Sequence, residues 1–174
     1  MIAPVESAII LAVPEAEPLV GALRKEGDAS AQHGVPAHVT LLYPFVDDPD
    51  VGIVEELRFF FAGVEGFALD FVAIGEFPEV VYLVPDQTKV LEDLIAALVR
   101  RWPGYPPYGG MFDTVVPHLT VVDTPDSALR ARAREHLMAG LPLRAPAVEA
   151  SLWLHEESGW TRVATFPLAA PEPD

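Results

Sequence analysis

One short pattern occurs twice in the chain, each time within an apolar segment. The first copy is His38-Val39-Thr40 and the second is His118-Leu119-Thr120. A proline closely precedes each copy, and apolar residues typical of a buried strand follow it. Side chains two positions apart in a strand project from the same face, so each copy should present an imidazole beside a hydroxyl. The fold must therefore accommodate one such strand in each half of the chain.

The elements predicted around the two motifs follow the same order in both halves. In the first half the periodicity predicts strand 8–13, helix 15–26, motif strand 38–43, helix 50–64 and strand 67–77. In the second half it predicts strand 80–84, helix 86–101, motif strand 118–122, helix 126–139 and strands 147–155 and 160–166. The sequence thus predicts a duplicated unit of strands and helices.

We expect a single α+β domain over residues 1–174, with antiparallel-rich sheets flanked by helices. The repeat predicts two lobes with pseudo-twofold symmetry, of about 1–78 and 79–174, which meet near Pro78 and Glu79. No flexible linker occurs at this boundary, so the lobes should pack as one unit around a central groove. A chain of 174 residues is long enough to bury a sizeable core.

Two histidines and two threonines in one groove would suit acid–base chemistry on a phosphate. Histidine populates both its neutral and its protonated form near neutral pH, so one imidazole can accept a proton while another donates one. Threonine hydroxyls on the same face can donate hydrogen bonds to the non-bridging phosphate oxygens. The pattern therefore favours cleavage or opening of a phosphodiester.

The sequence gives little support for other catalytic devices. It contains no cysteine, which excludes disulfides, thiolate nucleophiles and zinc sites built on sulfur. The aspartates near the motifs, such as Asp113 and Asp123, are better explained as loop and helix-capping residues than as metal ligands. The chain also lacks a Gly-x-Ser-x-Gly elbow and a Gly-x-x-x-x-Gly-Lys loop. We expect no metal ion and no cofactor.

The charge of the chain restricts its partners. A net charge of −15 repels duplex nucleic acid and long polyanions, but a small anion or a short RNA terminus can still enter a neutral cleft. The apolar stretch 8–13 is not preceded by lysine or arginine, as a secretory signal would be, and no segment is long enough to span a bilayer. We expect a cytoplasmic monomer with no membrane partner.

At the two motifs the sequence resembles the two-histidine (2H) phosphoesterase superfamily, in its 2'-5' RNA ligase-like and cyclic phosphodiesterase branch. Three segments carry the resemblance: Pro36-Ala37-His38-Val39-Thr40-Leu41-Leu42-Tyr43-Pro44-Phe45, Val116-Pro117-His118-Leu119-Thr120-Val121-Val122 and Pro106-Pro107-Tyr108-Gly109-Gly110. The likeness in layout covers nearly the whole chain, but its specific part is confined to these segments.

The resemblance implies a bilobal fold with His38 and His118 as the acid–base pair and Thr40 and Thr120 as phosphate ligands. It also implies a metal-independent hydrolase with a role in RNA processing, acting on a small cyclic-phosphate nucleotide, an RNA terminus or a 2'-5' linkage. Which histidine acts as the base depends on the direction of the reaction, and the sequence leaves this open.

Three aromatic residues near the motifs are further candidates for contact with the substrate. Tyr43 and Phe45 follow the first motif and could stack on a nucleobase, although Tyr43 could equally pack inward from its strand. Tyr108 lies in the loop before the second motif and could form part of a lid, or could anchor that loop on the core.

One cation is also a candidate for substrate binding. Arg162 lies on the last predicted strand and could bind a phosphate. An ion pair with Glu156 or Glu157 at the surface would explain it equally well.

Two kinds of function follow from this sequence. The first is a metal-independent phosphoesterase that uses two-histidine catalysis. The alternative is a non-catalytic module that binds a nucleotide or an RNA end in the same groove. Product analysis of a panel of 2',3'-cyclic nucleotides beside a thermal-shift assay distinguishes them, because stabilisation by the ligand without any product would favour the binding module.

Overall fold

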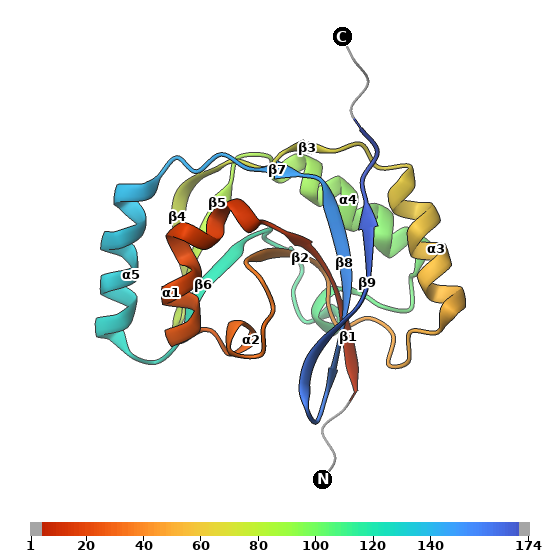
Figure 1. Ribbon diagram of the computed structural model, residues 1–174, viewed down its shortest axis with the longest axis horizontal. Coiled ribbons are helices and arrows are strands. Elements are labelled where there is room, and N and C mark those ends of the chain that lie inside the picture. The colour runs from red at the N-terminus through yellow and green to blue at the C-terminus, as the bar shows by residue number, and fades with distance from the viewer. Residues whose placement is uncertain (1–4, 171–174) are drawn as a thin grey trace.

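The computed structural model describes residues 5–170, which form a four-stranded, a three-stranded and a two-stranded antiparallel sheet with helices around them (Figure 1). The strands are β1 Glu6–Ala12, β2 His38–Leu42, β3 Phe67–Ala68, β4 Phe71–Phe77, β5 Val80–Pro85, β6 Leu119–Asp123, β7 Pro146–Ala147, β8 Glu149–Glu156 and β9 Gly159–Pro167. The helices are α1 Glu17–Gly27, α2 Ala29–Gln32, α3 Val51–Ala62, α4 Thr88–Arg101 and α5 Ser127–Gly140, with short 3-10 helices η1 at Pro14–Ala16 and η2 at Pro107–Gly110. The predicted α+β class is confirmed.

The larger sheet has the strand order β2-β1-β8-β9, the smaller sheet has the order β4-β5-β6, and β3 pairs with β7 alone. Figure 1 shows the smaller sheet with α1 and α5 on the left, and the larger sheet with α3 and α4 on the right. These two groups are the lobes of the molecule. The motif strands β2 and β6 lie against each other where the lobes meet.

The lobes do not coincide with the halves of the sequence. The two repeats are real, because β1-α1-β2-α3-β3-β4 is followed by β5-α4-β6-α5-β7-β8. However, the last strand of each repeat crosses to the other lobe: β4 pairs with β5, and β8 pairs with β1. The predicted boundary at Pro78 and Glu79 is therefore wrong as a lobe boundary, since it forms the turn between β4 and β5. Strand pairing is a non-local property that the periodicity does not encode.

The helices cross between lobes as well. Helix α1 packs on β6 and α5, while α4 packs on β2 and α3 packs on β9. One apolar cluster consequently contains residues of both sheets, including Leu11, Val39, Leu83 and Val121. Each motif strand thus sits on a core that both repeats build.

Capping residues set the starts of two helices. The Asp50 side chain accepts a hydrogen bond from the Ile53 amide at the start of α3, and Asp126 does the same for Ala128 and Leu129 at the start of α5.

The strand predicted at 67–77 is divided, because β3 pairs with β7 and β4 pairs with β5.

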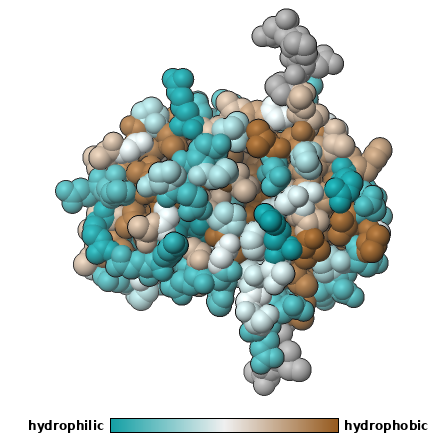
Figure 2. Space-filling view, viewed as in Figure 1, coloured by the Kyte–Doolittle hydropathy of each residue, from teal (hydrophilic) through white to brown (hydrophobic). Residues whose placement is uncertain are grey.

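The surface in this view has both hydrophilic and apolar regions. In Figure 2 hydrophilic residues predominate over α1 and α5, and apolar residues reach the surface near α3, where Phe59 is 86% exposed. Within residues 5–170, every helix is too short or too polar to cross a membrane.

Candidate active site

The two motifs occupy equivalent positions on the motif strands. His38 and Thr40 are half-buried on one face of β2, and Val39 between them is fully buried in the core. His118 immediately precedes β6, which begins at Leu119 and not at His118, and Thr120 lies two residues further along. The same alternation of buried and half-buried residues occurs in both segments. Each motif therefore presents an imidazole and a hydroxyl on one face, as its spacing predicts.

Both imidazoles are anchored in the same way. Nδ1 of His38 lies 2.7 Å from the carbonyl oxygen of Pro36, and Nδ1 of His118 lies 2.6 Å from that of Val116. A carbonyl oxygen can only accept a hydrogen bond, so Nδ1 carries the proton in both rings. Nε2 is then the nitrogen that remains to exchange a proton with a ligand.

The surroundings favour the neutral form of both rings. Burial, with smaller contributions from the charges of Arg24 and His118, lowers the pKa of His38 from 6.5 to about 4. Burial also lowers the pKa of His118. The charge of His118 is the smallest of the causes that act on the pKa of His38.

Every backbone polar group in the segment 35–37, which precedes the first motif, has a partner. The Val35 amide donates to the Ser30 carbonyl, and the Val35 carbonyl accepts from Nη1 of Arg24 at 3.1 Å. The Ala37 amide donates to Oε1 of Glu17 at 2.6 Å, while its carbonyl accepts from the Val13 amide. Pro36 lacks an amide hydrogen, and its carbonyl holds His38. We call this segment, with Glu17 and Arg24 of α1, the α1 clamp.

A buried ionic cluster supports the α1 clamp. Arg24 is only 2% exposed and donates to Oδ2 of Asp28 from both Nε and Nη2. Asp28 in turn accepts from the amide and the hydroxyl of Ser30 through Oδ1. A buried guanidinium requires such compensation, because an unpaired buried charge is costly.

The second motif is supported by aromatic packing. The ring of His118 contacts Phe77 and Tyr82, with centroids 5.2 Å and 5.1 Å away, and these two rings lie 4.4 Å from each other. Gly75, opposite Tyr82 in the β4–β5 pair, allows this packing, since a Cβ there would lie 2.3 Å from the Tyr82 ring.

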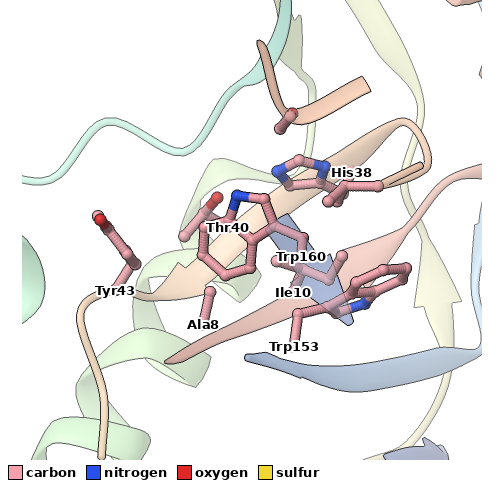
Figure 3. A pocket seen from close by; sticks show the side chains of 9 residues that line it. Ala8, Ile10, His38, Thr40, Tyr43, Trp153 and Trp160 are labelled. Carbon is pink, nitrogen blue, oxygen red and sulfur yellow. The ribbon is translucent and has the colours of Figure 1, made fainter. Parts of the chain in front are cut away.

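A pocket opens beside the first motif. It has a volume of about 130 Å³, so it is larger than the site of a single water molecule, which takes up about 30 Å³ in the liquid. Its lining consists of Ala8, Ile10, Ser30, Val35, His38, Thr40, Tyr43, Trp153 and Trp160. Figure 3 shows Thr40 and His38 along β2, with Trp153 of β8 and Trp160 of β9 on the same side of the pocket.

The structure separates the two aromatic candidates that follow the first motif. Tyr43 lines the pocket, and its hydroxyl donates to Glu6. Phe45 is 2% exposed and packs against Trp102 and Tyr105 in the core. The prediction that Phe45 contacts substrate is therefore wrong, because a ligand has no access to its ring.

The other two candidates lie outside this pocket. The amide of Tyr108 donates to the carbonyl of Tyr43, so the loop before the second motif is docked on the end of the first. Arg162 is exposed on the outer strand β9, opposite Trp153, and forms an ion pair with neither Glu156 nor Glu157. The structure brings Tyr43 to the motifs, but it does not bring Tyr108 or Arg162 to the pocket wall.

Several residues of the site escaped the sequence analysis, namely Arg24, Ser30, Trp153, Trp160, Phe77 and Tyr82. They belong to no recognisable pattern in the sequence. The structure groups no three histidine, aspartate or glutamate side chains of residues 5–170 closely enough to hold a metal ion.

The fold and the two motifs define a protein of the two-histidine phosphoesterase class. The chain belongs to the 2'-5' RNA ligase superfamily, whose family model matches residues 12–159. No curated protein matches the sequence.

Several solved structures share the fold. Escherichia coli LigT complexed with 3'-AMP is 17% identical, with a TM-score of 0.60 over 95% of this chain and 98% of LigT. TT0787 of Thermus thermophilus is also 17% identical, with a TM-score of 0.61 over 96% of this chain and 100% of TT0787. A protein described as a phosphoesterase is 18% identical, with a TM-score of 0.59 over 95% of this chain and 99% of its own. At these identities the likeness is one of fold.

Proposed function

We propose that the protein is a metal-independent phosphoesterase that opens 2',3'-cyclic phosphates or cleaves 2'-5' phosphodiesters. His38 and His118 form the acid–base pair, and Thr40 and Thr120 bind the phosphate. The observation that carries this proposal is the matched anchoring of the two rings, since Nδ1 of each is held by the carbonyl two residues earlier. Both Nε2 atoms are then available for proton transfer.

The reaction requires one imidazole of each kind. The neutral ring takes a proton from water, the water oxygen bonds to phosphorus, and one ribose oxygen leaves. The other ring, in its protonated form, supplies the proton that this leaving oxygen needs. Afterwards the protonation states of the two rings are reversed, and exchange with solvent restores them. The threonine hydroxyls stabilise the charge that gathers on the non-bridging oxygens.

The comparisons support the proposal at a coarser level. Membership of the 2'-5' RNA ligase superfamily and likeness to a phosphoesterase fit an enzyme that acts on phosphate esters. LigT structures that contain 3'-AMP and ATP suggest a substrate of nucleotide size. The net charge of −15 also favours a small substrate over a long nucleic acid.

The test is turnover of 2',3'-cyclic nucleotides and of a 2'-5'-linked dinucleotide, with product analysis in the presence of excess chelator. We expect hydrolysis that the chelator does not reduce. His38→Ala and His118→Ala should each lower kcat by about 10³-fold or more, because each removes one of two required proton carriers. Full activity of either variant would contradict the assignment. Binding of the nucleotide without any product would favour the non-catalytic module.

A further inference from the structure

The pocket beside His38 has two kinds of wall. Its polar lining residues are Ser30, His38 and Thr40, and six apolar or aromatic side chains form the rest: Ala8, Ile10, Val35, Tyr43, Trp153 and Trp160. These six pack into a small cluster that is separate from the main core. We call them the apolar wall. An apolar wall next to a phosphate-binding end suits a ligand that has both kinds of group.

Strand register brings the apolar wall and the first motif to one face of the larger sheet. Ile10 of β1 lies opposite Thr40, and Ala8 of the same strand lies opposite Trp153 of β8. Residues directly opposite each other on neighbouring strands share a face of the sheet, so the apolar wall and the first motif lie on the same face. Ala8, Ile10 and Trp160 also fall outside residues 12–159, so the matched family segment does not contain the whole wall.

The side chains of the apolar wall are held in place by their neighbours. Trp160 packs on His155 with ring centroids 4.8 Å apart and lies 6.1 Å from Tyr43. At the end of the hairpin, a Cβ on Gly159 would lie 2.7 Å from Nδ1 of His33, so the turn approaches the α2 segment closely. An aromatic surface fixed in advance loses little conformational entropy when a flat ligand stacks on it.

Nearly all polar groups of the apolar wall and of the adjacent Ser30 already have partners. The Tyr43 hydroxyl donates to Glu6, Nε1 of Trp153 donates to Ser151, and the Ser30 hydroxyl donates to Asp28. Among residues 5–170, the indole N–H of Trp160 is the wall's one side-chain donor without a partner. A single donor does not tell the four bases apart, because each base offers an acceptor. The wall therefore offers flat faces and very little hydrogen-bond readout.

The other side of the site, around His118, is occupied by aromatic rings. The rings of Phe77 and Tyr82 pack against His118, and Tyr82 is only 8% exposed, whereas Phe77 is 38% exposed. A substrate that places its phosphate between the two motifs would therefore direct its bulky group toward His38.

We infer that the apolar wall is a nucleoside subsite that holds the base by stacking and does not discriminate among the four bases. This inference rests on the proposed function and adds to it the side on which the nucleoside lies and the breadth of its specificity. Stacking is tolerant of sequence because every base has a π face. Strong discrimination would require buried hydrogen-bonding groups that the wrong base leaves unpaired, and the wall lacks them.

The first measurement is kcat/KM for the four 2',3'-cyclic nucleotides, which should agree within about tenfold because only stacking strength varies. Trp160→Ala should lower kcat/KM for 2',3'-cyclic AMP by about 10- to 100-fold, mainly through KM, and Trp160→Phe should retain most of the activity. With glycerol 1,2-cyclic phosphate, which has no base, Trp160→Ala should behave like the unmodified protein. Phe59→Ala, which removes an exposed aromatic side chain on α3, is the matched control.

Two results would overturn the inference: a preference above 100-fold for one base, or an equal loss on the base-free ester. The second result would indicate that Trp160 only supports the fold. Thermal melting of Trp160→Ala and Trp160→Phe would show such a loss of stability directly.

Calorimetry with 3'-AMP and with inorganic phosphate separates this failure from failure of the proposed function. If neither a cyclic ester nor a 2'-5' linkage is hydrolysed, the proposed function fails. In that case a loss of 3'-AMP affinity in Trp160→Ala, with unchanged phosphate affinity, still supports the subsite. Unchanged affinity for 3'-AMP would exclude it.

Discussion

The two motif segments share their chemistry but differ in what holds them. In both, Nδ1 of the histidine is held by a carbonyl two residues earlier. Before His38, side chains of α1 bind the backbone on either side of that carbonyl. Before His118, the segment 111–116 includes the exposed residues Met111, Phe112 and Val116. Among residues 5–170, the ring of His118 is the one side chain that is hydrogen-bonded to the backbone of this segment.

The difference shows that duplication of a fold does not duplicate its supporting contacts. Helix α4 is the counterpart of α1 in the second repeat, yet its Arg101 forms a surface ion pair with Glu56. Arg24 of α1 is buried in the ionic cluster below the first motif. One imidazole is thus held by a buried network, while the other depends on ring packing and a more exposed loop.

The largest expected effect concerns these two arginines. Arg24→Met leaves Asp28 as an unpaired buried carboxylate, so it should lower the free energy of unfolding by about 3 kcal/mol or more. Arg101→Met removes an exposed pair and should cost less than about 1 kcal/mol. Denaturant unfolding of both variants measures the difference. Equal losses would contradict the asymmetry between the two helices.

The threonines should behave alike, because the motifs are chemically equivalent. Thr40→Val and Thr120→Val keep the shape of the side chain and remove one phosphate donor, so each should lower kcat/KM by about 10²-fold. Both positions are half-buried, and the thermal midpoint should change little. A large loss for one variant and none for the other would show that only one motif contacts the phosphate.

The pH profile tests whether the pKa values of both histidines are lowered. Because the pKa of His38 is lowered to about 4 and that of His118 is also lowered from 6.5, kcat/KM should peak below pH 6.5, whichever ring is the base. An optimum above pH 7 would contradict the burial of both rings.

The ionic cluster should shift the limb of this profile that His38 controls. Arg24→Met removes a positive charge that disfavours protonation of His38, so its pKa should rise. Asp28→Asn removes a negative charge that favours protonation, so the pKa should fall. Shifts in opposite directions would identify Arg24 and Asp28 as positioning residues with an electrostatic effect. Identical shifts would indicate a general loosening of the fold.

The smallest effect is expected at Glu17. Glu17→Ala removes the acceptor of the Ala37 amide and should reduce kcat by about threefold, since one contact of the α1 clamp is lost and the others remain. Glu17→Gln keeps an acceptor oxygen and should retain full activity. An unchanged Glu17→Ala variant would show that this contact does not position His38.

The sequence allowed the repeat and most elements to be predicted, because apolar periodicity and proline and glycine positions are local signals. The motif residues were recognisable for the same reason. The exchange of β4 and β8 between lobes was not predictable, since pairing partners are chosen by the tertiary fold.

Site residues outside the motifs were harder to find. Arg24 lies in an amphipathic helix, where an arginine usually faces solvent, and only the fold shows that it is buried. Trp153 and Trp160 reach the site through the register of β1, β8 and β9. Phe45 was misassigned because nearness to a motif in sequence does not determine which face of the chain a side chain occupies.

Imidazole nitrogen NMR during titration with inorganic phosphate tests the central claim most directly. His38→Gln and His118→Gln assign the two rings. If both rings face one phosphate, the free protein should show the Nδ1–H tautomer in both, and both Nε2 signals should shift together with a single dissociation constant. A response from one ring alone, or two independent dissociation constants, would contradict a shared site.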